Sequence, residues 1–346
     1  MALTKTSYSM ITGAPVNVLD YGAKGDGVTD DTAAFNAAIA TGKKVYVPIP
    51  SGAGYVVNNI TVITNTVIEG EKSGISNGPT LIVTTSNSAA FRHTTSAVLY
   101  QIEIRNFVVK PLNTSLVNTQ VYKQDNTSTY TAYAKFENIE SYLDFTTSYD
   151  GFFIFTDWVN CRDGYVGNPN TSGKHTFIKC LPAAWGQGNQ ANINSIKHCK
   201  VFRAFGDVAA LDIGYGVDWY IELTDFENLD VQAVNAQGIY NIKFQSCWFE
   251  GIAAAQVGTF TASPAPAIGT RPVIFSDCHF HVSQITTYIA TLGAASRVGF
   301  TNCTFSNVPS GLLLSNSVAS MAGLDNLVTL SGAGAAGLFS GFNTTQ

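Results

Sequence analysis

The segment YNIKFQSCWFEG at residues 240–251 contains a hexapeptide that recurs along the chain. FQSCWF at 244–249 matches FSDCHF at 275–280 and FTNCTF at 300–305. Looser copies, with an apolar residue in place of the cysteine, are IRNFVV at 104–109, FENIES at 136–141 and FENLDV at 226–231. Cys161, Cys180 and Cys199, each 19 residues apart, complete nine anchors. Eight intervals over 196 residues average about 24.5 residues, a period typical of a solenoid.

Fixed columns surround each anchor. The third residue before it is large and apolar in all nine copies, and the residue directly before it is asparagine in five. Inward positions alternate as in a strand on either side, but the alternation slips by one residue at the asparagine. Asparagine tolerates the left-handed backbone of a tight bend, and its amide can bond its counterpart one turn away. We therefore predict an all-β chain folded as a right-handed parallel β-helix, with the six cysteines as small buried residues in one stack.

The composition excludes several classes of function. Charged residues make up 12% of the 346, and the net charge is −5, so no basic surface for nucleic acid is expected. No apolar run is long enough to span a membrane, and no signal peptide is visible, which indicates folding in the cytoplasm. No CxxC pair or Cys/His cluster has metal-ligand spacing, so neither metal nor cofactor is predicted.

A short helix is predicted before the repeats. Residues 16–42 read VNVLDYGAKGDGVTDDTAAFNAAIATG. Thr29 is the expected N-cap, Asp30 and Asp31 would lie in the first turn, and Gly42 would end the helix. An amphipathic helix here would cover the open end of a solenoid. This role also accounts for the two aspartates without catalysis.

This segment resembles the N-terminal signature of the pectate-lyase-like β-helix superfamily. SYSMITGAPVNVLDYGA at 7–23 is more specifically similar to the lead-in of the β-helix in bacteriophage tailspikes. The resemblance implies a homotrimeric spike in the phage tail, assembled in the host cytoplasm, that recognises and can depolymerise a bacterial surface polysaccharide. It divides the chain into an attachment segment (1–15) that would contact other tail proteins, a cap with the first strands (16–60), the β-helix (61–310) and a Gly/Ala-rich tail (311–346). The Gly-His-Gly and Arg-x-Lys motifs of pectin hydrolases are absent, so no catalytic residue is carried over.

An acid-rich segment is the candidate sugar site. Seven of the 24 acids lie between Asp207 and Asp230, where there is no lysine or arginine. From the repeat alignment, Asp230 and Glu250 are expected as outward diagonal neighbours about 7–8 Å apart, within the range for an inverting glycosidase pair. Asp218 or Glu222 could replace either carboxylate. The expected sugar-binding residues, chosen mainly as aromatic platforms, are Trp219, Trp248, Tyr220 and His281.

Three functions remain open at this point. The first is a phage spike that binds a surface polysaccharide, either as a depolymerase, with hydrolysis favoured over elimination, or as a non-cleaving adhesin. The second is a polysaccharide lyase or hydrolase that is not part of a virion. The third is a structural tail or baseplate component without catalysis. Outward acids on a solenoid are also often simply solvated.

Overall fold

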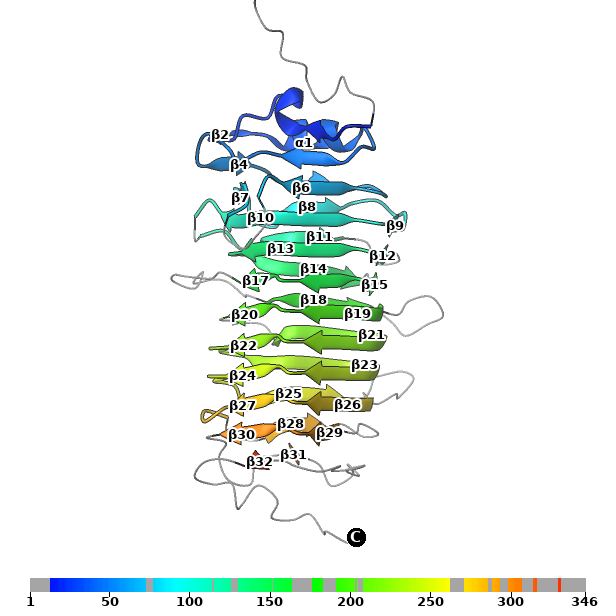
Figure 1. The fold of residues 1–346 in the computed structure, drawn as a ribbon, viewed down its shortest axis with the longest axis vertical. Helices are drawn as coiled ribbons and strands as arrows, with labels where there is room; N and C mark the ends of the chain where they lie inside the picture. The colour runs from blue at the N-terminus through cyan, green and yellow to red at the C-terminus, as the bar shows by residue number, and fades with distance from the viewer. Residues whose placement is uncertain are drawn as a thin grey trace, which may run out of the picture.

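The structure is a computed structural model. It describes residues 13–72, 77–113, 115–125, 130–150, 152–163, 176–182, 191–202, 204, 208–261, 271–285, 288–292, 298–306, 314–315 and 329–330. These residues stack as coils along one long axis, with the N-terminal coils at the top of Figure 1. The strand pairs between successive coils are parallel, as in β10 with β13 or β21 with β23. The predicted parallel β-helix is therefore confirmed.

Each coil contributes strands to three faces of the stack. We number the faces 1 to 3 in the order in which the chain passes through them within a coil. Face 1 contains β3 (Val45–Val47), β6 (Val67–Gly70), β16 (Asp157–Val159), β19 (Ala191–Lys197), β26 (Arg271–Ser276), β29 (Val298–Thr301) and parts of β10 (Glu103–Pro111), β13 (Lys135–Ser141), β21 (Ala209–Glu222) and β23 (Gln232–Gln245). β1 (Val16–Asn17) pairs with β3 at its start.

Face 2 is short and carries the residues discussed below. It contains the ends of β10 and β13 with β4 (Gly54–Val56), β7 (Thr80–Val83), β17 (Arg162–Asp163), β20 (Lys200–Phe202), β22 (Asp225–Glu227), β24 (Trp248–Glu250), β27 (His279–His281), β30 (Thr304–Ser306) and β32 (Thr329–Leu330). β2 (Asp26–Asp30) pairs with β4.

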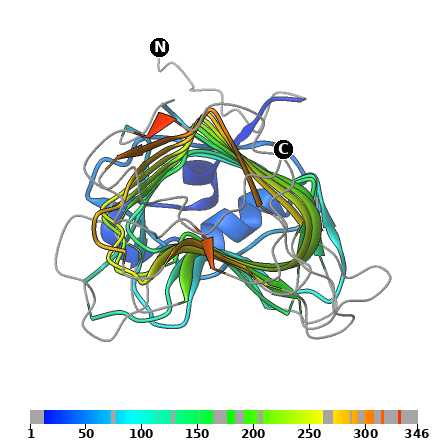
Figure 2. The ribbon, with the colours of Figure 1, turned by 90° about the horizontal axis from the view of Figure 1, so that it is seen from below.

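Face 3 closes the coil. It contains the first parts of β21 and β23 with β5 (Ile60–Thr61), β8 (Ala89–His93), β11 (Gln120–Gln124), β14 (Asp144–Asp150), β18 (Ile178–Pro182), β25 (Gln256–Thr261), β28 (Tyr288–Leu292) and β31 (Leu314–Ser315). A separate small sheet of β9 (Leu99–Tyr100), β12 (Tyr130–Ala132) and β15 (Phe152–Ile154) precedes the corner back to face 1. Figure 2 shows the coils superimposed along the axis.

The corner between faces 1 and 2 has the predicted left-handed backbone. Asn106, Asn138, Asn160 and Asn302 have φ between 51° and 67°. Asn138 Nδ2 donates to Asn106 Oδ1 at 2.9 Å, and Asn160 Nδ2 donates to Asn138 Oδ1 at 2.5 Å. Each side-chain amide thus bonds to its counterpart one coil away, and this ladder holds the same bend at the same position of successive coils.

The core is built from inward residues stacked on their counterparts. Phe226, Phe249, Phe280 and Phe305 form one such column on face 2, with ring centroids 5.0, 4.8 and 5.0 Å apart and nearly parallel planes. The six cysteines are free and buried, as predicted. Their thiols donate to backbone carbonyls, for example Cys161 Sγ to Phe136 O, so they fill the core rather than form bridges.

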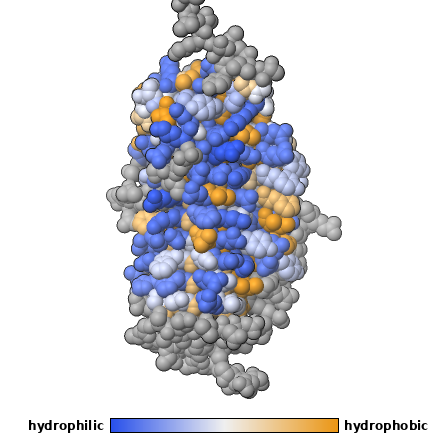
Figure 3. Space-filling view, in the orientation of Figure 1, coloured by the Kyte–Doolittle hydropathy of each residue, from blue (hydrophilic) through white to orange (hydrophobic). Residues whose placement is uncertain are grey.

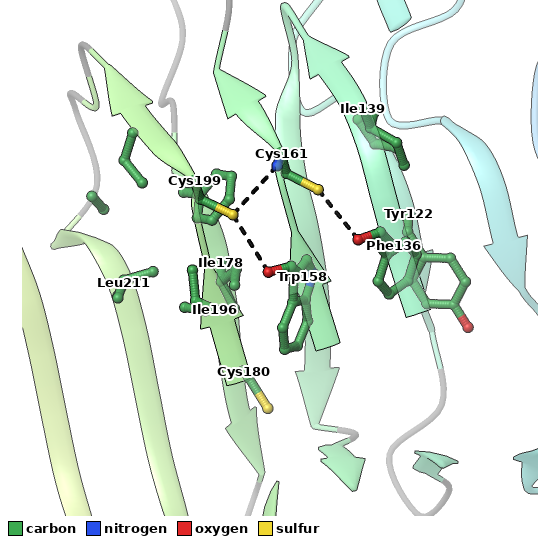
Figure 4. Close-up of a cluster of buried hydrophobic side chains, with 14 of the residues drawn as sticks. Tyr122, Phe136, Ile139, Trp158, Cys161, Ile178, Cys180, Ile196, Cys199 and Leu211 are labelled. Atoms are coloured by element: carbon green, nitrogen blue, oxygen red, sulfur yellow. Dashed lines mark hydrogen bonds between the residues drawn. The ribbon is translucent and has the colours of Figure 1, made fainter. Parts of the chain in front are cut away.

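Cys180 does not belong to the predicted stack. Cys161 and Cys199 lie one coil apart at the first corner, and Figure 4 shows Cys180 away from them. Cys180 belongs to β18 on face 3, where it pairs with Ser148 and Ile213 of the neighbouring strands. The equal spacing of 19 residues is a coincidence, because Cys161 and Cys199 are a full coil of 38 residues apart and Cys180 lies on a different face of that coil.

The anchor at Leu229 is also wrong. Phe226 pairs with Phe249, the second residue after Cys247, so the anchor in that coil is Thr224 and the corner residue is Leu223, with φ of 46°. The described coils from Phe107 to Cys303 therefore have eight anchors, and seven intervals over 196 residues average 28 residues. The error arose because FENL, at a different corner, mimics the asparagine corner sequence.

The helix over the N-terminal end of the stack is confirmed, but it begins later than predicted. α1 spans Thr32–Ile39 and lies across the end of the coils in Figure 2. Thr29 lies in β2, so it is not the N-cap; Asp31 takes that position, while Asp30 Oδ1 accepts from the Thr32 amide at 2.9 Å. The buried Asp31 carboxylate instead accepts the amides of Lys24 and Gly25, which holds the preceding loop against the helix. Gly42 follows the helix with φ of 68°, as expected.

The predicted attachment segment lies, up to residue 12, outside the described residues, and so does most of the Gly/Ala-rich tail. Among the helices in the described part of the chain, none has the length and apolar character required to cross a membrane.

Candidate functional site

The outer side of face 2 brings chemically active side chains into two columns. In β20, β22, β24, β27 and β30 one inward apolar residue lies between two outward residues, because successive side chains point to opposite sides of a strand. We call the outward set of five strands the face 2 array. Its first column is Lys200, Asp225, Trp248, His279 and Thr304, and its second is Phe202, Glu227, Glu250, His281 and Ser306.

An aromatic pair lies at the centre of the array. The rings of Trp248 and His279 stack with centroids 4.1 Å apart and planes inclined by 12°. Trp248 Nε1 donates to Glu250 Oε2 at 2.8 Å, and this bond orients the carboxylate along its own strand. Ser306 Oγ lies 3.0 Å from His279 Nε2 and 3.1 Å from His281 Nδ1. Burial, with the nearby His281, lowers the pKa of His279, so its ring is neutral at physiological pH.

Three carboxylates are adjacent to this pair. Glu227 and Glu250 are direct neighbours on successive coils, and Asp225 neighbours Trp248. Lys200 Nζ lies 2.8 Å from Glu227 Oε2, so Glu227 is neutralised by an ion pair. Burial raises the pKa of Asp225, and the charges of Glu227 and Glu250 raise it further, while Lys200 opposes them. Asp225 is therefore the carboxylate of this group that is shifted toward retaining a proton.

Asp225 and Glu250 are diagonal neighbours. They lie one coil apart and two residues apart along the strand. Such diagonals separate residues by about 7–8 Å. An inverting glycosidase holds its acid and base about 6.5–9.5 Å apart, with room for a water molecule between base and sugar. This spacing, with the raised pKa of Asp225, suits Asp225 as an acid opposite a second carboxyl group at Glu250.

The predicted pairing of Asp230 with Glu250 is wrong. Glu250 neighbours Glu227, and the chain then turns at Asn228, which lies beside Gly251 of the next coil. Asp230 is exposed beyond this turn, and its backbone amide donates to Ala204 O at 2.9 Å. The five-residue error in the anchor moved Asp230 into the position that Asp225 occupies.

The other predicted carboxylates lie elsewhere on the coil. Asp218 is at the corner between faces 3 and 1, with φ of 58°, and its Oδ1 accepts from Asn241 Nδ2 at 2.7 Å. Glu222 is on the outer side of face 1, 3.6 Å from Lys197 Nζ, and is separated from the face 2 array by the corner at Leu223. Neither therefore joins Asp225 and Glu250 in one site.

The predicted sugar-binding residues divide in the same way. Trp219 is 0% exposed and stacks on Trp158 in the core at 6.1 Å, so the prediction of an outward platform is wrong. Tyr220 is half-buried on the outer side of face 1, between Ser195 and Lys243. Trp248 and His281 do lie outward with Glu250, as the repeat columns around Cys247 and Cys278 predicted.

Sequence reasoning missed Asp225 and Glu227 as site residues. Both belong to the acid-rich segment, but the wrong anchor placed Phe226 on face 1. A usable signal exists, because DFE at 225–227, WFE at 248–250 and HFH at 279–281 share a central phenylalanine between two functional residues. Within the described ranges, no group of three or more His, Cys, Asp or Glu is placed to hold a metal ion.

Comparison with known proteins supports the architecture. A family described as rhamnogalacturonase A/epimerase, pectate lyase-like, matches residues 15–148. The tailspike protein of Acinetobacter phage vB_ApiP_P1 superimposes with a TM-score of 0.65, at 15% identity, over 96% of this chain and 63% of its own. The gp42 tailspike of Acinetobacter phage vb_AbaP_AS12 also gives 0.65, at 12% identity, over 87% of this chain and 53% of its own. The chain has the pectate-lyase-like fold of phage tailspikes.

A short stretch of this tailspike-like chain is also related in sequence to phage appendage proteins. The pre-neck appendage protein of Bacillus phage B103 is 52% identical over 62 residues, which are 18% of this chain and 7% of that protein. That of Bacillus phage phi29 is 53% identical over 55 residues, or 6% of its length. The match therefore spans a small part of these curated relatives. The right-handed β-helix is confirmed by the fold of the structural neighbours.

Proposed function

We propose that this chain is part of a phage tail appendage in the virion and binds a bacterial surface polysaccharide on the face 2 array, where Asp225 and Glu250 hydrolyse it. The relationship to phage appendage proteins and the tailspike fold support the location. The observation that carries the chemistry is the raised pKa of Asp225 diagonally opposite Glu250, beside an exposed Trp248.

Asp225 is the proposed general acid. Burial raises the pKa of Asp225, and a carboxyl group that keeps its proton to a higher pH is better suited to protonate the glycosidic oxygen as the bond breaks. Glu250 is the proposed base, which removes a proton from the water that attacks the opposite face of the sugar. Its Oε2 accepts from Trp248, and this fixed bond leaves Oε1 to contact the water. The products are two shorter chains, with inverted configuration at the new reducing end.

Trp248 is the proposed platform for the sugar ring. His279 covers one face of the indole, while the neighbour on the other side is the much shorter Asp225. The indole therefore extends beyond the Asp225 carboxyl group, and a sugar stacked on its free face lies above that carboxyl group. His281, one coil from Glu250, is placed to contact a hydroxyl group of the same sugar.

The charges favour a neutral or amino sugar polymer over a uronic acid polymer. Elimination from a uronate requires a base and a cation that neutralises the sugar carboxylate. In the five strands of the array, Lys200 is the cationic side chain, and it is already paired with Glu227. The Glu250 carboxylate, which has no cationic partner among the described residues of the array, would instead repel an anionic sugar. We therefore favour hydrolysis over elimination.

Polymer size is the first test. Purified surface polysaccharides from a panel of candidate hosts are incubated with the full chain and separated by gel filtration, with the anomeric form of the product read by NMR. We expect one polymer to shorten to defined oligosaccharides with inverted configuration. Asp225→Asn and Glu250→Gln should abolish the shortening, while the matched control Glu222→Gln, on face 1, should keep it.

Other outcomes distinguish the alternatives. A polymer that co-elutes with the protein but keeps its size would indicate a non-cleaving adhesin. The absence of both cleavage and co-elution across the panel would favour a structural tail component. Antibody labelling of purified virions tests the location, because cleavage by a chain that is missing from virions would indicate a free polysaccharide hydrolase or lyase.

A further inference from the structure

Ser306 lies between two histidine rings on the last strand of the face 2 array. Its Oγ is 3.0 Å from His279 Nε2 and 3.1 Å from His281 Nδ1. A third neighbour, the carbonyl oxygen of Phe280, is farther away at 3.4 Å. A hydroxyl group has one hydrogen and two lone pairs, so it can donate to one ring nitrogen while it accepts an N–H from the other. The proposed hydrolysis of the polymer does not use Ser306.

This environment differs from that of other serines in the described part of the chain. The Ser141 hydroxyl donates to the carbonyl oxygen of Leu143 at 2.9 Å, and Ser276 Oγ donates to Asp277 Oδ2 at 2.9 Å. These acceptors hold the hydroxyl group within a turn or beside a corner. A histidine ring is instead the base that most often takes a proton from a reacting group. The contacts of Ser306 therefore suit a nucleophile that is activated by a neighbouring base.

His279 is the better placed of the two rings to act as this base. Burial, with the nearby His281, lowers the pKa of His279, so the ring is neutral and can accept a proton. The ring is held against Trp248, with centroids 4.1 Å apart and planes inclined by 12°. The charge of Glu250 acts in the opposite direction on the same pKa, which means that it stabilises the ring once it is protonated. A base that activates a serine needs both an orienting contact and a stabilising charge.

We propose that Ser306 and His279 form an esterase site, which removes acyl groups from the hydroxyl groups of a sugar bound on the face 2 array. The sugar substrate rests on the proposed function, but the ester chemistry needs neither Asp225 nor cleavage of the polymer. Ser306 lies two coils beyond Trp248, and successive coils are about 4.8 Å apart. A polymer that stacks one sugar on Trp248 and runs along the array brings a following sugar to Ser306.

The reaction balances with the groups present. As Ser306 Oγ attacks the ester carbonyl carbon, His279 Nε2 takes the hydroxyl proton. The bond between the carbonyl carbon and the sugar oxygen then breaks, and His279 returns the proton to that oxygen, which leaves a free sugar hydroxyl and an acyl group on Ser306. Water releases the carboxylic acid by the same two steps, with its proton passing through His279 to Ser306.

His281 is placed to stabilise the oxygen that becomes negative in each step. Because Ser306 donates to His279, the hydrogen shared between Ser306 and His281 belongs to His281 Nδ1. This N–H already points at the nucleophile. It can therefore donate to the oxyanion that forms on the carbon attacked by Ser306, as the donors of an oxyanion hole do.

A neutral acyl ester is the substrate class that suits the surroundings. The Glu250 carboxylate, one coil from His281, would repel an anionic group, whereas the ester of a sugar hydroxyl with a simple acid is uncharged. Ser306 and His279 are half-buried on the outer side of their strands, so a sugar can reach them from solvent. In Figure 3 the left side of the molecule, over β24 and β27 in Figure 1, is mainly hydrophilic, which suits a hydrated polymer. An O-acetylated sugar is the simplest substrate of this class.

Covalent labelling tests whether Ser306 is a nucleophile. The full chain is incubated with diisopropyl fluorophosphate, and the modified residue is located by mass spectrometry of its peptides. We expect an adduct on Ser306 that forms about 100-fold more slowly in His279→Gln, because a general base contributes about 10²–10⁴-fold. Ser276→Ala is the matched control, since Ser276 is half-buried on the outer side of face 1 and bonds to a carboxylate; Ser306 should react in it as in the wild type. The absence of an adduct on Ser306, or equal rates in the wild type and His279→Gln, overturns the proposal.

Ester hydrolysis tests turnover. The full chain is incubated with 4-nitrophenyl acetate or glucose pentaacetate, and the release of 4-nitrophenol and acetate is measured. We expect an initial burst of about one 4-nitrophenol per chain, the signature of an acyl-enzyme intermediate. Ser306→Ala should lose the burst and release acetate from the sugar ester about 100-fold more slowly, with an unchanged circular dichroism spectrum.

The comparison with Ser306→Ala also excludes histidine acting alone. Imidazole groups cleave 4-nitrophenyl acetate without a serine, so equal release by the wild type and Ser306→Ala would overturn the proposal. Release no faster than in buffer would overturn it as well. Neither ester contains the polymer, so a failure in these assays is distinct from a failure to shorten a surface polysaccharide.

Discussion

Asn138 offers a quantitative test of how the first corner holds the coils together. Its side chain donates to Asn106 Oδ1 at 2.9 Å and accepts from Asn160 Nδ2 at 2.5 Å, and its φ is 54°. Asn138→Gly keeps a residue that adopts this backbone but loses both bonds, which contribute about 0.5–1.5 kcal/mol each. A glycine also loses more entropy on folding, by roughly 0.5–1 kcal/mol. The expected loss of unfolding free energy is therefore about 1.5–4 kcal/mol.

Asn138→Ala adds the backbone term. Alanine loses the same two bonds and must hold a left-handed conformation that costs about 1–2 kcal/mol, without the extra entropy of glycine. The loss of unfolding free energy that the two variants share measures the hydrogen bonds of the ladder, and the difference between the two losses compares the left-handed strain of alanine with the entropy of glycine. Asn138→Asp loses the donor but keeps an acceptor for Asn160 Nδ2. Urea denaturation followed by circular dichroism measures the differences. If Asn138→Gly and Asn138→Ala both unfold at the wild-type urea concentration, the ladder does not stabilise the corner and the reasoning is refuted.

Three further predictions concern the core and the array. Asp225→Asn should be more stable than wild type at pH 7, because the raised pKa of Asp225 means that folding disfavours its charged carboxylate. The contribution of Asp225 to wild-type stability should fall as pH rises from about 4 through its folded pKa. Urea midpoints of the wild type that rise over that pH range would contradict this prediction. Trp219→Ala should lower the free energy of unfolding by about 3–5 kcal/mol in the same assay, because it empties a buried site. Trp219→Phe should lower it much less, since the indole Nε1 has no hydrogen-bond partner among the described residues. Equal losses for the two variants would show that the nitrogen is bonded. Trp248→Ala should weaken polysaccharide binding roughly ten-fold in titration calorimetry with little change in stability, and unchanged affinity would remove Trp248 from the site.

Part of the face 2 array can be predicted from the sequence pattern, and part of it cannot. The sequence correctly predicts that Trp248, Glu250 and His281 point outward, because each lies at a fixed distance after a cysteine anchor and alternation along a short strand is a local property. The pairing partner of Glu250 was not predictable in the same way. It depends on which residue of the preceding coil lies beside it, and that register is set by contacts between strands that are 23 residues apart in the chain.

The sequence by itself determined the parallel β-helix, the buried cysteines and the left-handed asparagine corner, because inward alternation and the tolerance of asparagine for positive φ act within a few residues. Only the tertiary structure decided that Cys180 lies on face 3, that Trp219 is buried and that Asp225, not Asp230, is diagonal to Glu250. Several of the described coils contain more than one left-handed corner, as at Ile193 and His198, and the loops between corners differ in length. Similar local sequences can therefore mark different corners, and only the hydrogen-bonded register between coils tells them apart.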